Sequence, residues 1–276
     1  MAAVRTRWLL LAVVIAVLAV GSIVMVSNSD NNRSPDEPVA PGVTTVRWYG
    51  QAFFVIHSKT GAKFAFDPYA TNENLAYSPP DVSADYVFVS HNHFDHNNVS
   101  LLSGNPKKIG PIEEEFKSGT AIVGDNKYTY TAVSTFHDTV KGKERGKNTV
   151  YKITVDDIRF CHLGDLGEPL TDDQIRQIGE VDVLFVPVGG YFTIDAKGAE
   201  KVVEQLKPKI VVPMHYKTDK VNLPIAGVDN FIDGKADKVR NFTDLVLKDK
   251  KDLPSEITIY VMKYRQGELP CQKNKK

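Results

Sequence analysis

Three of the seven histidines in the chain lie in one short run, His91-Asn92-His93-Phe94-Asp95-His96. In an extended loop, residues two apart point to the same side, so His91 and His93 can converge on one metal ion. Asp95 and His96 can turn toward a second ion. Imidazole and carboxylate groups suit zinc, iron or manganese, and zinc is the default expectation. The run therefore predicts a site for a pair of divalent metal ions.

More ligand candidates stand far along the chain. His137, Asp165 and His215 each lie at or near the end of an apolar run that reads as a β-strand. Ligands delivered from successive strand ends can gather at one edge of a sheet, and an anionic Asp165 can bridge both ions and offset part of their repulsion. His137 or His215 taken alone fits an ordinary structural role. Metal ligation is favoured only because both occur together with the run from His91 to His96.

His57 and His162 belong neither to the run from His91 to His96 nor to the ligand candidates at strand ends, and we interpret both as structural residues. Because His162 lies three residues before Asp165, it is also a candidate for supporting a ligand from behind.

The elements that must position these residues are mostly strands. Short apolar runs alternate with turn signals through most of the chain, and the pair Asp156-Asp157 between two of them predicts a hairpin. Helices are expected over residues 172–178, where Thr171 and Gln174 have capping-box spacing, and over about 194–206, where apolar residues follow a helical repeat. The order suits stacked sheets with outer helices. The predicted strands are residues 43–48, 52–56, 63–66, 86–90, 128–134, 150–155, 158–163, 183–188, 210–213 and 257–263.

The amino-terminal end differs from the rest. Residues 8–26 are apolar except for Gly21 and Ser22, and as a helix rising about 1.5 Å per residue they would span roughly 28 Å, close to the core of a bilayer. Arg5 and Arg7 precede this run, so the positive-inside tendency keeps the N-terminus in the cytoplasm and sends the body outside. An uncleaved transmembrane anchor and a cleaved signal peptide both remain open; the second would leave a secreted protein.

These features divide the chain into a signal anchor or signal peptide (1–26), a flexible tether (27–42), a folded domain large enough for an enzyme (43–263) and a polar tail (264–276). Lys plus Arg and Asp plus Glu both number 34, so no global positive field favours nucleic acid as a partner. Cys161 and Cys271 are too few for a disulfide framework. The sequence indicates no oligomeric state.

The run from His91 to His96, together with His137, the segment 162–165 and Pro213-Met214-His215, resembles the metallo-β-lactamase superfamily over residues 43–262. The likeness is strongest to the branch of zinc-dependent hydrolases and ascorbate-6-phosphate lactonase, because of Phe136-His137-Asp138, the segment 145–149 and the segment 188–195.

This resemblance implies an α+β fold, a four-layer αββα sandwich with the metals at one edge of its sheets. It assigns His91, His93 and His137 to the first ion, and Asp95, His96 and His215 to the second, with Asp165 bridging them. It also implies that Asp67 holds a ligand histidine from behind. Antibiotic-hydrolysing members commonly have Cys where Asp165 stands, which disfavours penicillins. Flavodiiron members have Glu at the His93 position, which disfavours electron transfer.

The expected reaction is hydrolysis by a hydroxide bridging the ions, with Asp95 passing a proton to the leaving group. The leading substrate is a small metabolite, with an anionic one favoured, that carries an ester, lactone or related bond. A phosphodiesterase acting on a lipid headgroup or nucleic acid, and a non-catalytic metal-binding envelope protein, are the alternatives. The residues that are candidates for substrate contact, against the alternative of ordinary loop residues, are Arg145, Asn148, Tyr191, Tyr216 and Lys217.

Overall fold

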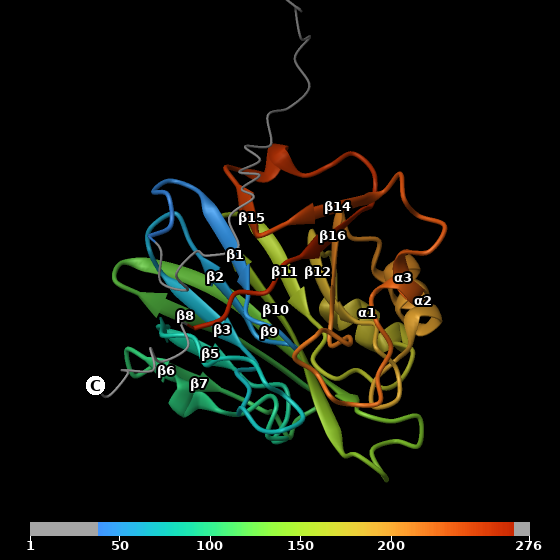
Figure 1. Ribbon diagram of the computed structural model, residues 1–276. Coiled ribbons are helices and arrows are strands. Elements are labelled where there is room, and N and C mark those ends of the chain that lie inside the picture. Colours follow the sequence, from blue (N-terminus) through green and yellow to red (C-terminus); the bar gives the residue numbers. More distant parts are fainter. Residues whose placement is uncertain (1–37, 268–276) are drawn as a thin grey trace, which may run out of the picture.

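Two β-sheets of unequal size pack against each other in the computed structural model, which describes residues 38–267 (Figure 1). The expected membrane or signal segment over residues 1–26, and most of both the expected tether and the polar tail, lie outside the described residues. Within residues 38–267, none of the helices has the length and apolar character that crossing a bilayer requires.

The smaller sheet has six strands in the order β15-β1-β2-β3-β5-β7. Their bounds are β1 (Thr44–Trp48), β2 (Phe54–His57), β3 (Lys63–Phe66), β5 (Tyr86–Phe88), β7 (Lys107–Ile109) and β15 (Asp244–Leu247). Two short strands, β4 (Val82–Ser83) and β6 (Leu102–Ser103), pair with each other.

The larger sheet has eight strands in the order β14-β16-β13-β12-β11-β10-β9-β8. Their bounds are β8 (Phe116–Val123), β9 (Asn126–Phe136), β10 (Lys147–Val155), β11 (Ile158–His162), β12 (Val183–Pro187), β13 (Ile210–Met214), β14 (Val239–Phe242) and β16 (Thr258–Met262). The predicted hairpin is confirmed, because β10 and β11 pair antiparallel across Asp156 and Asp157, whose φ angles are 51° and 67°. Positive φ at both positions matches the twist of a two-residue hairpin turn.

The helices lie beside the larger sheet (Figure 1). The first predicted helix is confirmed as α1 (Asp172–Ile178), which packs on β9 and β10 and begins with the Thr171–Gln174 capping box. The second is confirmed as α2 (Ala196–Leu206), whose N-cap Asp195 accepts a hydrogen bond from the Gly198 N–H at 2.8 Å. The short helices are α3 (Asp229–Ile232), η1 (Val99–Leu101) and η2 (Lys250–Asp252).

Alternation along the strands divides the apolar side chains into two clusters. Phe54 of β2 joins the cluster between the sheets, where its ring centroid lies 4.4 Å from that of Phe185 on β12. Val55, the next residue, points to a second cluster on the opposite face of the smaller sheet. Both faces of the smaller sheet are therefore buried, and successive residues of β2 join different clusters.

The outer face of the smaller sheet differs from the four-layer arrangement that the resemblance implied. In the described part of the chain, loop side chains cover it where a helical layer was expected, including Tyr69, Tyr77 and Val221. The segment between β3 and β5 contains Pro79-Pro80 and has no helical apolar repeat, so it crosses this face as an extended loop.

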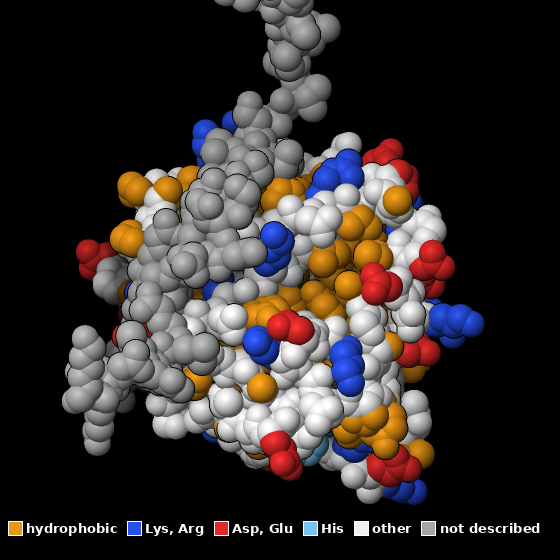
Figure 2. Space-filling view, viewed as in Figure 1, with side chains coloured by type: hydrophobic (Ala, Val, Ile, Leu, Met, Phe, Trp, Pro, Cys, Tyr) orange, Lys and Arg blue, Asp and Glu red, His pale blue; other side chains and the backbone are white. Residues whose placement is uncertain are grey.

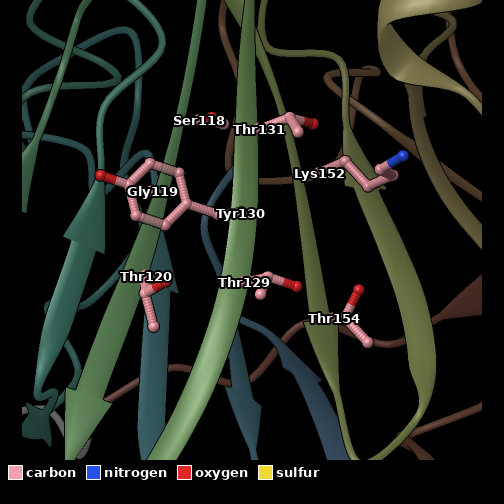
Figure 3. Close-up of a pocket in the computed structure, with 8 residues that line it drawn as sticks. All are labelled: Ser118, Gly119, Thr120, Thr129, Tyr130, Thr131, Lys152 and Thr154. Atoms are coloured by element: carbon pink, nitrogen blue, oxygen red, sulfur yellow. The ribbon is translucent and has the colours of Figure 1, made fainter.

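Charged side chains are interspersed on the face shown in Figure 2, in agreement with the balanced composition. A separate hollow lies on β8, β9 and β10 (Figure 3), and its lining residues are mainly hydroxyl-bearing, such as Thr129 and Thr131. This hollow contains no histidine or carboxylate among its lining residues, so it is distinct from the ligand candidates.

Strand direction brings the ligand-bearing loops to one edge. β1 and β3 are both antiparallel to β2, and β5 is parallel to β3. In the larger sheet, β9 and β11 are both antiparallel to β10, while β11, β12 and β13 are parallel. The loops that follow β1, β3, β5, β9, β11, β12 and β13 therefore leave from equivalent ends of their sheets.

Candidate metal centre

Those loops bring together two adjoining groups of side chains with metal-ligating atoms. Within each group the candidate ligand atoms lie within 4.8 Å of one another. Every member is buried except His93, which is exposed and marks the open side of the centre. The groups are His91, His93 and His137, and Asp95, His96, Asp165 and His215.

Asp165 lies between the two groups. Its Oδ2 is 3.8 Å from His91 Nε2 and 3.2 Å from His137 Nε2, both members of the first group. The same oxygen is 3.3 Å from His215 Nε2, and Oδ1 is 3.1 Å from His96 Nε2, in the second group. One carboxylate can therefore reach an ion in either group, which is the geometry of a bridging ligand.

Asp67 holds the loop that carries most of the candidates. It follows β3, and its carboxylate accepts hydrogen bonds from the Ser90 N–H at 2.7 Å, the Ser90 hydroxyl at 2.6 Å and His96 Nδ1 at 2.8 Å. Because the single Ser90 hydroxyl proton goes to Asp67, Ser90 Oγ accepts from His91 Nδ1 at 2.9 Å. Both imidazoles thus turn Nε2 toward the centre.

The ionisable side chains of the centre shift one another's pKa values. Burial lowers the pKa of His91 to about 3, with repulsion from His96 adding to the effect, so this imidazole is neutral. Burial also opposes the charged form of His215, but the carboxylates of Asp165 and Asp95 outweigh it and raise its pKa to about 9. Burial would raise the pKa of Asp165, yet His215, His96 and His137 hold it well below the usual range. Carboxylates and imidazoles thus compensate one another in the buried part of the centre.

Donor atoms without hydrogen-bond partners test whether a metal fits. Among the described residues, His96 Nε2, His215 Nε2 and Asp165 Oδ1 are buried and have no hydrogen bond of acceptable geometry. Buried polar atoms are ordinarily satisfied, and these three all belong to the second ligand group, where a metal ion would satisfy them. The donor set of imidazoles and carboxylates fits divalent ions such as zinc.

His162 supports the turn that carries Asp165. Its Nε2 donates to the Ala52 carbonyl at 2.9 Å, and its Nδ1 accepts from the Gly164 N–H at 3.1 Å. Its Nδ1 is 3.9 Å from Asp67 Oδ2, so the residue lies behind the ligand candidates.

Close backbone contacts also shape the centre. Gly164 has φ +56°, and a Cβ there would lie 2.3 Å from Asn148 Oδ1. A Cβ on Gly189 would lie 2.2 Å from the His215 carbonyl oxygen. Only glycine allows these approaches, so both positions set how near Asp165 and His215 come to the other ligands.

Two substrate-contact predictions are corrected by burial. Asn148 is 0% exposed. Its amide donates to Thr135 Oγ1 and the Leu163 carbonyl and accepts from the Asp165 N–H at 2.9 Å, so it positions Asp165. Tyr216 is 5% exposed and packs on Trp48 with ring centroids 5.2 Å apart, so it belongs to the core.

The other candidates are accessible. Tyr191 is 66% exposed and adopts φ 62°, an uncommon conformation for a bulky residue. Its ring contacts Phe192, over which the Arg145 guanidinium lies at 5.8 Å. Lys217 is exposed, and its Nζ donates to the Leu223 carbonyl at 3.0 Å.

The loop that presents Arg145 is organised by a residue that the sequence did not single out. The Asp138 carboxylate accepts hydrogen bonds from the backbone N–H groups of Val140, Gly142, Glu144 and Arg145, at 2.8 to 3.0 Å. Desolvation alone would raise the pKa of Asp138, but these hydrogen bonds lower it to about 2. The adjacency of Asp138 to His137 was the available signal.

Comparison with known proteins agrees with this geometry. Residues 45–215 match the family model described as "Beta-lactamase superfamily domain". A protein of Archaeoglobus fulgidus named a UPF0173 metal-dependent hydrolase is 30% identical over 63% of this chain and 83% of its own length. One of the same name from Anaeromyxobacter is 33% identical over 67% of this chain and 79% of its own length.

Solved structures share the architecture. A structure from Thermotoga maritima, described as a Zn-dependent hydrolase of the metallo-beta-lactamase superfamily, is 33% identical with a TM-score of 0.62 over 80% of this chain and 100% of its own. A metal-dependent hydrolase from Parabacteroides distasonis is 15% identical with a TM-score of 0.53 over 80% of this chain and 94% of its own, which supports the fold alone.

Proposed function

This chain belongs to the metallo-β-lactamase superfamily and is a metal-dependent hydrolase, and from that premise we propose that it cleaves an ester, lactone or related bond of a small anionic metabolite at a two-metal site. The observation that carries the proposal is Asp165, whose Oδ2 lies 3.2 Å from His137 Nε2 in one group and 3.3 Å from His215 Nε2 in the other. Two bound divalent ions would supply an acidified water and polarise the bond that it attacks.

The side chains of the proposed site have separate roles. His91, His93 and His137 would hold one ion, while Asp95, His96 and His215 would hold the other. Asp95 would also take the proton of the attacking water and release it to the leaving group, because its Oδ2 is directed into the second group, 3.7 Å from His215 Nε2. Asp67 keeps His96 in orientation throughout.

Arg145 supports an anionic substrate. Asp138 binds the Arg145 backbone N–H at 2.8 Å and so fixes the loop, while Phe192 packs beside the Arg145 guanidinium. A guanidinium held in this way presents two donors to a carboxylate or phosphate. The exposed Tyr191 ring packs on Phe192, with ring centroids 4.7 Å apart, and would contact the less polar part of the same molecule.

The test combines metal analysis with a panel of lactones, carboxyl esters and phosphodiesters. We expect the purified chain to contain about two divalent ions, with zinc the first expectation, and to turn over lactones or esters. With Zn²⁺ held high enough to saturate both sites, Asp95→Asn should lower kcat by roughly 100-fold or more. Arg145→Gln should raise KM for anionic substrates and leave KM for neutral analogues unchanged.

The two alternative functions predict different results in these assays. Turnover confined to phosphodiesters would favour the phosphodiesterase, and metal without any turnover would favour a binding protein. Wild-type rates in Asp95→Asn with full metal would refute the proton-transfer role.

We also propose that the apolar run at residues 8–26 directs the domain across the cytoplasmic membrane, either as an anchor or as a cleaved signal. Fractionation of cells that produce the full chain tests this. Membrane or extracytoplasmic recovery supports the proposal, whereas full recovery in the cytoplasm contradicts it.

A further inference from the structure

Gln51 lies at the same edge of the sheets as the ligand-bearing loops, although it is not a metal-ligand candidate. It follows β1, one of the strands whose C-terminal ends reach that edge. The residue is 0% exposed and adopts φ 51°, in the left-handed region. A buried glutamine in that backbone region is unusual enough to need a reason.

The backbone of Gln51 fastens the turn to the ligand loops. Its N–H donates to the Tyr77 hydroxyl at 3.3 Å. Its carbonyl accepts from the Trp48 indole at 3.1 Å and from the His215 N–H at 3.1 Å. On the side of Gln51 these bonds use main-chain atoms only, so they would survive replacement of its side chain.

The Gln51 side chain makes a contact of its own, with a carboxylate of the centre. Its amide lies 3.1 Å from Asp95 Oδ2. An ionised carboxylate only accepts hydrogen bonds, so the amide must present Nε2, and Oε1 then has no hydrogen-bond partner among the described residues. The same Asp95 oxygen lies 3.4 Å from His96 Nε2 and 3.7 Å from His215 Nε2. Gln51 thus binds the oxygen that faces the second group of ligand candidates.

The histidines that face the Asp95 carboxylate, His96 at 3.4 Å and His215 at 3.7 Å, are themselves ligand candidates, whereas Gln51 reaches it from outside both groups. His96 is kept in orientation by Asp67 and the backbone of Asp165 by Asn148. A carboxylate on a loop can rotate, and rotation would turn Oδ2 away from the ion. A neutral donor restrains that rotation without competing for the metal, since an amide nitrogen bears no free lone pair.

We propose that Gln51 is a positioning residue that holds the Asp95 carboxylate in ligating orientation for the second metal ion. This inference rests on the proposed two-metal function and assigns the support of one ligand within it. Its effect falls on the ion bound by Asp95, His96 and His215, and leaves the ion bound by His91, His93 and His137 unaffected.

The test is calorimetric titration of the chelator-stripped full chain with Zn²⁺ alone. Gln51→Met keeps the size of the side chain and removes the donor. We expect wild type to bind about two equivalents of Zn²⁺. In Gln51→Met, the equivalent assigned to the second group should bind about 10-fold or more weakly than in wild type, and the other equivalent should bind unchanged. Titration of His93→Ala, which lies in the first group, assigns the two equivalents.

Gln205→Met is the matched control. Gln205 Nε2 also donates a single hydrogen bond, to the Leu170 carbonyl at 2.8 Å, and its Oε1 also lacks a partner, but it lies on α2. Both equivalents should bind this variant as they bind wild type. Gln51→Leu provides a second donor-free variant if the methionine variant does not fold.

A double-mutant cycle separates positioning from general packing. If Gln51 acts through Asp95, then Gln51→Met should weaken Zn²⁺ binding no further in an Asp95→Ala background, where no side-chain acceptor is left for Gln51 Nε2. Additive losses, equal weakening of both equivalents, or wild-type affinity in Gln51→Met would each overturn the inference while the two-metal site stands. Failure of wild type to bind Zn²⁺ would overturn the proposed function and this inference together.

Discussion

At the residue scale, the centre depends on groups that never reach the substrate. Asp67 is 1% exposed and accepts three hydrogen bonds, two from Ser90 and one from His96. Burial would raise the pKa of Asp67, but attraction to His96 and its hydrogen bond outweigh this and lower it. Asp67 therefore stays ionised and sets which nitrogen of His96 faces the metal.

Asp67→Asn should accordingly weaken metal binding. An amide of the same shape can accept from the Ser90 N–H but cannot serve all three donors as a carboxylate does. We expect metal affinity to fall about 10- to 100-fold and the metal-free protein to lose about 1–3 kcal/mol of unfolding free energy. Zn²⁺ titration and thermal unfolding measure the two effects.

Asp85→Asn is the control for this substitution. Asp85 also accepts a backbone hydrogen bond, from the Lys63 N–H at 2.7 Å, but it is exposed and stands before β5. Its replacement should leave metal affinity unchanged. An Asp67→Asn protein with wild-type affinity would show that the histidine loop holds its shape without the carboxylate.

At the element scale, the loop of residues 138–146 is held by one side chain. Asp138 gathers four backbone N–H groups, and its pKa is lowered to about 2 because these hydrogen bonds outweigh desolvation. A folded-state pKa below the unfolded value of about 3.9 means that the stabilisation is complete above that value and is lost as pH falls through about 2.

Amide hydrogen exchange should report this loss directly. In wild type, protection at Val140, Gly142 and Arg145 should decrease as pH falls from about 4 toward 2, beyond the intrinsic pH dependence of exchange. In Asp138→Asn the protection should already be weak at neutral pH. Asp125→Asn, in the exposed turn between β8 and β9, should leave the loop as in wild type. Unchanged protection in Asp138→Asn would mean that the rest of the loop suffices.

At the scale of the whole molecule, the metal centre joins the two sheets. His91 and His96 follow a strand of the smaller sheet, while His137, Asp165 and His215 follow strands of the larger one. Ions held by both sets would link the sheets in the folded protein only, so they would stabilise it by mass action.

Removal of metal should therefore lower the unfolding temperature. At free Zn²⁺ about 1,000-fold above Kd, each bound ion contributes about 4 kcal/mol, and a chelator should abolish this gain. Differential scanning calorimetry with and without chelator measures the shift. His215→Gln should reduce the shift, whereas His57→Gln, at a buried histidine outside both ligand groups, should retain it. An equal shift in His215→Gln and wild type would contradict the assignment of His215.

Much of the architecture was predictable from local signals. Predicted strands at 63–66 and 183–188 correspond to β3 and β12, and the helix at 172–178 to α1, because apolar period and capping chemistry act over a few residues. Strand β8 escaped prediction because it is largely exposed and carries Lys117, Ser118 and Gly119 in place of an apolar run.

The chemistry of the centre could be inferred from residue types and spacing, because the run from His91 to His96 and the distant His137, Asp165 and His215 already indicated metal binding. The surroundings of those ligands depend on how the chain folds. Gln51 stands 44 positions from Asp95 and Asn148 stands 17 positions from Asp165, so no local pattern could pair them. Ligand type follows from side-chain chemistry, whereas orientation and burial follow from which strand ends the fold brings to the same edge.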